Sequence, residues 1–195
     1  MKTHPRFVIL LALDAFGGDI VGKTLLQKRL YFLEELLKCR HGLCPGFDFD
    51  AHYYGPYSAV VSSEVTTLGV GGMVREESSS FGFSPSTGFE VRRYRYQLTD
   101  AGREALRWVK QHCAEEAGRV AETVAELVRA GDPDYMGLSV AAKSHWILSR
   151  ARQPLTAQAI AQEARRFGWE VTEAQIHKAA QFLQNLGLPA NAGQR

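Results

Sequence analysis

The chain has 195 residues, of which 45% are hydrophobic, and a formal net charge of +2. This length allows one domain or two small ones, each with a buried core. Basic and acidic residues are balanced in both halves, with 11 and 11 in residues 1–100 and 12 and 10 in residues 101–195. The strong basic bias of a dedicated nucleic-acid binder is therefore absent. A membrane span requires about 18 consecutive apolar residues, and no apolar run in the sequence is that long. We therefore expect a cytoplasmic protein without membrane contact.

The cysteine content argues against a disulfide scaffold, because Cys39, Cys44 and Cys113 are an odd number. Cys39, His41 and Cys44 lie close together in the sequence, and His112 beside Cys113 could supply a further zinc ligand. The spacing C-x4-C is at the loose end of structural zinc sites. Reduced thiols at a helix end and in a loop are the alternative, and we expect no other cofactor.

The first two predicted helices cover residues 4–15 and 23–40. In the first, Pro5 suits the opening turn and Gly17 suits the end, although a short apolar run also fits a buried strand. The second helix has a clear period. Its buried face is expected to carry leucines three or four residues apart, namely Leu26, Leu30, Leu33 and Leu37. Its solvent face is expected to carry Lys23, Gln27, Lys28, Glu34, Glu35 and Lys38.

Between these helices, residues 17–24 read GGDIVGKT, which fits the P-loop pattern G-x-x-x-x-G-K-T. A P-loop also requires a strand before it and an acidic residue at the end of another buried strand, where magnesium is held. The sequence offers no such acidic strand end and no strand–helix alternation that would build a parallel sheet. We therefore favour a helix-to-helix connection and no enzymatic activity, with an ATP- or GTP-binding P-loop as the minor alternative.

The next segment, residues 47–54, alternates apolar and polar side chains and is predicted to be a strand. A Gly-Pro pair ends it. Ser58 is the expected N-cap of a third helix, which runs through residue 68. This helix carries Glu64 and no lysine or arginine.

A β-hairpin is predicted from residues 73–78 and 89–98, with a tip at 79–88 that is rich in Ser, Gly and Pro. Thr99 is the expected N-cap of one long helix over residues 100–130. Its apolar residues recur at steps of three or four over about three heptads. This stripe fits either a dimeric coiled coil or packing against the second half of the chain.

The C-terminal part is predicted to be a small helical unit. A Gly-Asp-Pro-Asp sequence at residues 131–134 is the best domain boundary. The first helix beyond it covers residues 138–151. The second is capped by Thr156, and the third by Thr172, with Gln175 completing a capping box. Helices at this spacing are typical of a helix-turn-helix unit.

These elements predict a mainly α fold with a small β-hairpin, that is, an α+β fold. It would consist of a winged helix-turn-helix domain (residues 1–99) and a connecting or dimerisation helix (100–131). A second, helix-turn-helix-like unit would follow (135–188), and then a disordered tail (189–195).

Two groups of motifs resemble known bacterial families over roughly residues 5–110. The sequences Leu26-Gln27-Lys28 and Leu30-Tyr31-Phe32, followed by Tyr54-Gly55-Pro56-Tyr57-Ser58, resemble the uncharacterised YwgA-like proteins and the Panacea (SocA-like) antitoxin domain. The passage Leu98-Thr99-Asp100-Ala101-Gly102 is similar to the exit from the wing in many bacterial regulators. The resemblance implies a winged-helix fold without catalytic residues, and an antitoxin role in which the domain neutralises a partner toxin.

The leading interpretation is a transcriptional regulator that binds double-stranded DNA as a homodimer. Arginine and lysine neutralise phosphates, and glutamine suits bidentate contact with adenine. The candidates on the wing and the second helix are Arg92, Arg93, Arg95, Lys23 and Lys28, with Arg75 across the hairpin. The candidates in the C-terminal unit are Arg165, Arg166, Gln175, His177, Lys178 and Gln181.

Two alternatives remain open for these surfaces. The hairpin arginines could pair with Glu76, Glu77 and Glu90, and the C-terminal glutamines could form an ordinary solvent-exposed face. The other functional interpretation is a module that binds a partner protein, with Tyr53, Tyr54 and Tyr57 as its contact surface.

Overall fold

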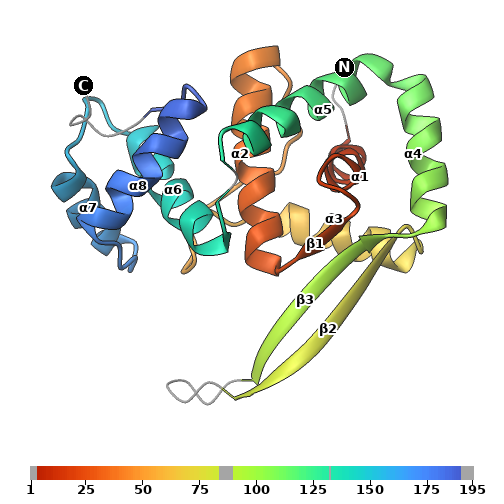
Figure 1. Cartoon of the computed structure of the whole chain (residues 1–195), viewed down its shortest axis with the longest axis horizontal. Helices are drawn as coiled ribbons and strands as arrows, with labels where there is room; N and C mark the ends of the chain where they lie inside the picture. Colours follow the sequence, from red (N-terminus) through yellow and green to blue (C-terminus); the bar gives the residue numbers. More distant parts are fainter. Residues whose placement is uncertain (1–3, 84–89, 132, 190–195) are drawn as a thin grey trace.

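The computed structural model describes residues 4–83, 90–131 and 133–189, and these residues form helices around one small antiparallel sheet (Figure 1). The predicted α+β class is confirmed. The helices are α1 (Pro5–Ala15), α2 (Lys23–His41), α3 (Ala59–Val70), α4 (Asp100–His112), α5 (Ala114–Arg129), α6 (Tyr135–Leu148), α7 (Ala157–Arg166) and α8 (Glu173–Asn185). The strands are β1 (Asp19–Val21), β2 (Val74–Phe83) and β3 (Glu90–Leu98). The predicted hairpin tip lies partly, and the predicted tail almost wholly, outside the described residues.

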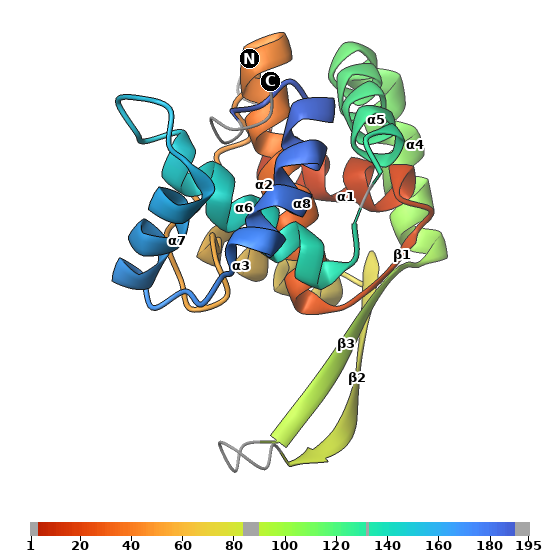
Figure 2. The same cartoon turned by 60° about the vertical axis from the view of Figure 1, so that its left-hand side comes forward.

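The sheet has the order β1-β3-β2, and both pairs of strands are antiparallel. β1 was not predicted. It pairs with the base of β3, where Ile20 lies opposite Tyr96 and both side chains are buried. The outer parts of β2 and β3 extend away from the helices in both views (Figures 1 and 2). The hairpin therefore joins the core only at its base.

The centre of the molecule is formed by α1 and α2. α1 packs against α3, α4 and α5, and α2 packs against α5 and α6. The buried hydrophobic side chains of the described residues form one cluster that reaches from α1 to α8. A polar contact also joins α2 to α6, because the Tyr31 hydroxyl lies 2.7 Å from Nδ1 of His145. Burial lowers the pKa of His145 to about 4, so this imidazole is neutral at ordinary pH.

The single long helix predicted over residues 100–130 is wrong, because the chain turns at Cys113, between α4 and α5. Cys113 has φ −130° and ψ 49°, which lies outside the helical region. The turn lets α5 cross α1 and α2 (Figure 1). The apolar stripe is buried inside the chain at Leu106, Val109, Val120, Val124 and Leu127. Packing against the chain itself accounts for the stripe without a coiled coil.

The predicted strand at residues 47–54 is also wrong. In the described structure this segment is irregular and has one isolated bridge, between Asp50 and Tyr57, with both N–O distances 2.9 Å. Within the described residues, no strand pairs with it. Its backbone is instead bonded to side chains of α2 and of the C-terminal part of the chain, as described below.

The C-terminal helices follow the predicted caps closely. Thr156 caps α7, and Thr172 with Gln175 forms the predicted capping box at the start of α8. α6 begins at Tyr135 and packs against α2 and α8. No helix within the described residues combines the length and the apolar character needed to cross a membrane.

Candidate functional site

Three polar side chains of α2 that were predicted to face solvent are buried. These are Gln27, Lys28 and Glu34. The Gln27 amide makes two backbone hydrogen bonds to Ser58: Nε2 donates to its carbonyl, and Oε1 accepts from its N–H, each at 3.0 Å. Oε1 of Glu34 accepts from the N–H of Phe47 at 2.9 Å. These contacts fix both ends of residues 47–58, which we call the α2–α3 loop.

Lys28 holds this loop near its C-terminal end. Its side chain is only 1% exposed, and its Nζ donates to the carbonyl oxygen of Pro56 at 2.5 Å. Burial, and then the neighbouring Lys143, lower the pKa of Lys28 to about 7. The assignment of Lys28 to a DNA-contacting surface is therefore wrong, because its ammonium group lies inside the protein.

The C-terminal part of the chain holds the same loop from the other side. Nε1 of Trp169 donates to the carbonyl of His52 at 2.6 Å, and Oγ of Ser139 donates to the carbonyl of Tyr54 at 2.9 Å. The rings of Tyr53 and Tyr54 remain 68% and 61% exposed, with centroids 5.0 Å apart. A well-anchored backbone therefore presents two neighbouring tyrosines to solvent.

Tyr57 differs from this exposed pair in its burial and in its partners. It is half-buried, its hydroxyl lies 2.7 Å from Oγ of Ser62 on α3, and its ring centroid is 5.0 Å from that of His52. Lys23 is exposed, with Nζ 5.9 Å from the ring centroids of both Tyr57 and Tyr94. The structure thus groups Tyr57 with Lys23 at the start of α2.

The strand register divides the hairpin arginines between two faces. Directly opposed residues point to the same side of an antiparallel sheet. Arg93 and Arg95 share one face, while Arg92 lies on the face of Tyr94. Arg95 is paired with Asp19 on β1, with Nε 3.0 and 3.1 Å from the two carboxylate oxygens. This hydrogen bonding lowers the pKa of Asp19, and it leaves Arg95 largely neutralised.

Charge is also divided along the length of the hairpin. In its inner half, Glu76 lies opposite Tyr96 and Glu77 lies opposite Arg95. Farther out, Arg93 lies opposite Ser79 and Arg92 opposite Ser80, and both arginines are exposed. We call Ser79, Ser80, Arg92 and Arg93 the basic end of the hairpin. It combines guanidinium groups with hydroxyls, which both bind phosphate.

In the C-terminal unit, two glutamines are engaged within the chain. Oε1 of Gln175 accepts from the N–H of Thr172 at 2.9 Å, and Nε2 of Gln181 donates to Oδ1 of Asn185 at 3.0 Å. His177 and Lys178 are exposed on α8. The two glutamines must release these contacts before they can read a base.

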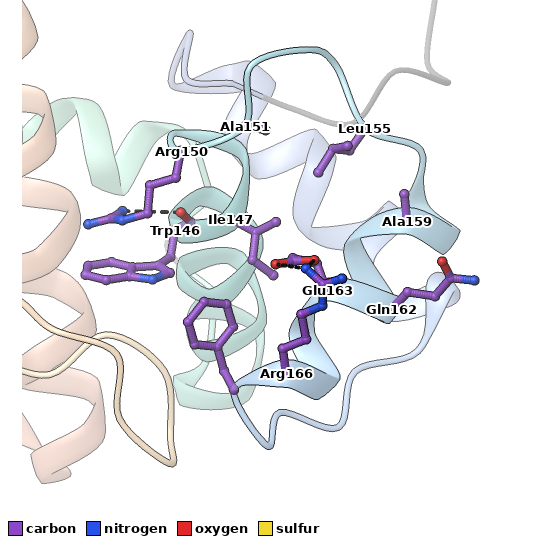
Figure 3. Close-up of a pocket in the computed structure, with 10 residues that line it drawn as sticks. Trp146, Ile147, Arg150, Ala151, Leu155, Ala159, Gln162, Glu163 and Arg166 are labelled. Carbon is purple, nitrogen blue, oxygen red and sulfur yellow. Dashed lines mark hydrogen bonds and ion pairs between the residues drawn. The ribbon is translucent and has the colours of Figure 1, made fainter.

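Arg165 and Arg166 end α7 and are exposed. Arg166 borders a cavity of about 460 Å³ between α6 and α7 (Figure 3). Its guanidinium is paired with Glu163 at 2.8 Å. On another side of this cavity, the Arg150 guanidinium stacks 3.2 Å from the ring centroid of Trp146. The charged groups around this cavity are thus already paired or stacked.

The GGDIVGKT segment does not have the arrangement that a P-loop requires. Helix α1 precedes it, and its central residues form β1. The Gly18 N–H donates to the carbonyl of Leu13 at 2.7 Å, and the Gly22 N–H donates to that of Tyr94 at 2.8 Å. These amides are therefore unavailable to cradle phosphates. Within the described part of the chain, no group of three or more His, Cys, Asp or Glu residues could hold a metal ion.

No family model matches the chain. It is similar to the uncharacterized protein YwgA of Bacillus subtilis (strain 168), with 28% identity over 103 residues. This similarity covers 52% of the chain and 52% of YwgA, so the chain spans about half the length of that relative. The match weakly supports a relationship to YwgA-like proteins, and it assigns no activity because YwgA is itself uncharacterized.

Proposed function

We propose that the protein binds double-stranded DNA through the basic end of its hairpin, as a winged-helix protein of the regulator type. The order of elements supports this proposal. A helix, a short strand and two helices precede the hairpin, and β1 pairs with its second strand. This order is in line with a winged helix, in which the hairpin would be the wing.

The observation that carries the proposal is the placement of Arg92 and Arg93. The hairpin extends away from the helices (Figure 2). Its strand register places the two arginines on opposite faces, directly across from serines. Guanidinium groups on both faces of a narrow ribbon can contact the phosphates on either side of it. Lys23, near the base of the hairpin, adds a third exposed cation.

The third helix favours binding without strong sequence preference. α3 carries no lysine or arginine, and its Glu64 is paired with Arg6 at 2.8 Å. The hydroxyls of Thr66 and Thr67 donate to backbone carbonyls of their own helix, at 3.0 and 2.9 Å. Phosphate contacts by the hairpin would therefore dominate over base contacts by α3.

The test is the double substitution Arg92→Glu/Arg93→Glu, measured by fluorescence anisotropy with duplex DNA over a series of salt concentrations. We expect affinity to fall about tenfold or more on any sequence, and the slope of log K against log salt to become shallower by about 2, because two phosphate contacts are lost. The matched control is Arg129→Glu/Arg152→Glu, which makes the same charge change at exposed positions away from the hairpin. Affinity that ignores salt, or that falls equally in both variants, contradicts the proposal.

A second candidate function is binding of a partner protein, in line with the antitoxin role that the Panacea resemblance implies. The large exposed fractions of Tyr53 and Tyr54 favour it, since tyrosines on a rigid backbone are frequent hot spots at interfaces. Affinity capture would compare the wild type, Tyr53→Ser/Tyr54→Ser and Arg92→Glu/Arg93→Glu. We expect a specific partner to be lost from the tyrosine variant and retained by the arginine variant. Identical capture by all three proteins would reject this surface.

A further inference from the structure

A second cavity, of about 330 Å³, lies between the first turns of α2 and the α2–α3 loop. Its volume falls within the range of small-molecule sites, about 300–1,000 Å³. It is separate from the basic end of the hairpin. The residues that line it are Lys23, Thr24, Gln27, Lys28, His52, Tyr54, Gly55 and Tyr57.

Two lysine side chains line the cavity. Lys23 is exposed, and Lys28 is buried beneath the loop. Gly55 separates Lys28 from Lys143, because a Cβ at this glycine would lie 3.0 Å from Cγ of Lys143 and 3.4 Å from Cε of Lys28. None of the lining residues in the described structure carries a carboxylate. The site therefore gathers cations without a counter-charge from its own wall.

Flat groups form the rest of the wall. The rings of His52 and Tyr57 have centroids 5.0 Å apart with an interplanar angle of 36°. Tyr54 is largely exposed and adds a third ring. Stacked or edge-on contact with such rings favours an aromatic or otherwise flat ligand. Gln27 is already committed to Ser58, and Lys28 donates to Pro56. Lys23 and the remaining donors of the Lys28 ammonium are therefore the main polar groups left to orient a ligand.

We propose that this cavity binds a small oxyanion, a carboxylate or a phosphate carried on a flat ring. Its charged group would lie near Lys23 and Lys28, and its ring would contact His52 and Tyr54. Charge–charge attraction is stronger in a partly buried site than in water. An anion would also favour the charged form of Lys28, which burial alone disfavours. This proposal does not depend on DNA binding.

Isothermal titration of the full chain tests the proposal with two pairs of probes. Benzoate and adenosine monophosphate are the anionic probes, and benzamide and adenosine are their neutral counterparts. We expect at least one anionic probe to bind. Its neutral counterpart should bind at least about tenfold more weakly, which corresponds to about 1.4 kcal/mol. Preference for benzoate identifies a carboxylate ligand, and preference for adenosine monophosphate identifies a phosphate ligand. Inorganic phosphate is the probe without a ring. If it binds as tightly as the anionic probes that carry a ring, the proposed contact with the ring is wrong.

Substitutions then place the binding in this cavity. Lys23→Gln, at an exposed residue, is expected to weaken binding about tenfold, because the lysine nearest the anion on the open side of the cavity is lost. Tyr54→Ala should weaken the ring probes and spare inorganic phosphate. Lys110→Gln, at an exposed lysine of α4, is the matched control and should leave every affinity unchanged. If no anionic probe binds at millimolar concentration, or if Lys23→Gln binds as the wild type does, the proposal is wrong.

Discussion

Gly102→Ala is expected to destabilise the folded chain by about 3 kcal/mol or more. An added Cβ would lie 2.1 Å from the carbonyl oxygen of Met73 and 3.3 Å from Cδ2 of Leu98. The backbone cannot easily move apart, because Thr99 donates from its N–H to Met73 and from its hydroxyl to Gly72, at 3.1 and 2.6 Å. Helix propensity favours alanine over glycine by only about 1 kcal/mol, so the steric clash dominates.

Gly118→Ala is the matched control for this prediction. Gly118 lies within α5, and an added Cβ would meet no atom within 4 Å. We expect this substitution to stabilise the protein by about 0.5–1 kcal/mol. Urea unfolding followed by circular dichroism measures both variants. If Gly102→Ala stabilises the protein as Gly118→Ala does, the described close approach of α4 to Met73 is contradicted.

Lys28→Met is expected to remove a large part of the pH dependence of stability above neutrality. In the folded chain the pKa of Lys28 is about 7, against an ordinary value of 10.5. Between these two values the unfolded chain binds the proton and the folded chain does not. The free energy of unfolding of the wild type therefore rises with pH across this window. The total contribution is on the order of 5 kcal/mol.

The measurement is urea unfolding of the wild type and Lys28→Met at several pH values from neutral to alkaline. Lys178→Met, at an exposed lysine of α8, is the control and should keep the wild-type slope. The Lys28 variant should be the more stable protein at low pH, provided that the loss of the bond to Pro56 costs less than about 3 kcal/mol. Parallel pH profiles for all three proteins would show that Lys28 is not held as described.

Local chemistry explains why many helix starts could be predicted from the sequence. Side-chain oxygens at N-caps bond to backbone N–H groups two or three residues away. Ser58, Thr99, Thr156 and Thr172 all form such caps in the structure. The alternation of side chains along a strand likewise requires Arg93 and Arg95 to share one face, which agrees with the register of β3.

Features that depend on distant residues were missed. Three-residue β1 is a strand only because β3 pairs with it, and Arg95 is neutralised by an aspartate 76 positions away. The bend at Cys113 was missed because the apolar period continues through it. The apolar residues of α2 do cover more than one side of the helix, which is typical of a buried helix. That signal could have indicated that Gln27 and Lys28 are buried.

The contacts of the α2–α3 loop bear on the order in which parts of the chain fold. Its partners Ser139 and Trp169 lie 85 and 117 positions later than Tyr54 and His52, respectively. During synthesis the N-terminal residues leave the ribosome first. The loop can bond early to Gln27, Lys28 and Glu34 of α2. The carbonyl groups of His52 and Tyr54 receive their partners only once the C-terminal part of the chain has been made. The cavity and the exposed tyrosines therefore take their final form at the end of folding, after the hairpin and its arginines have been made.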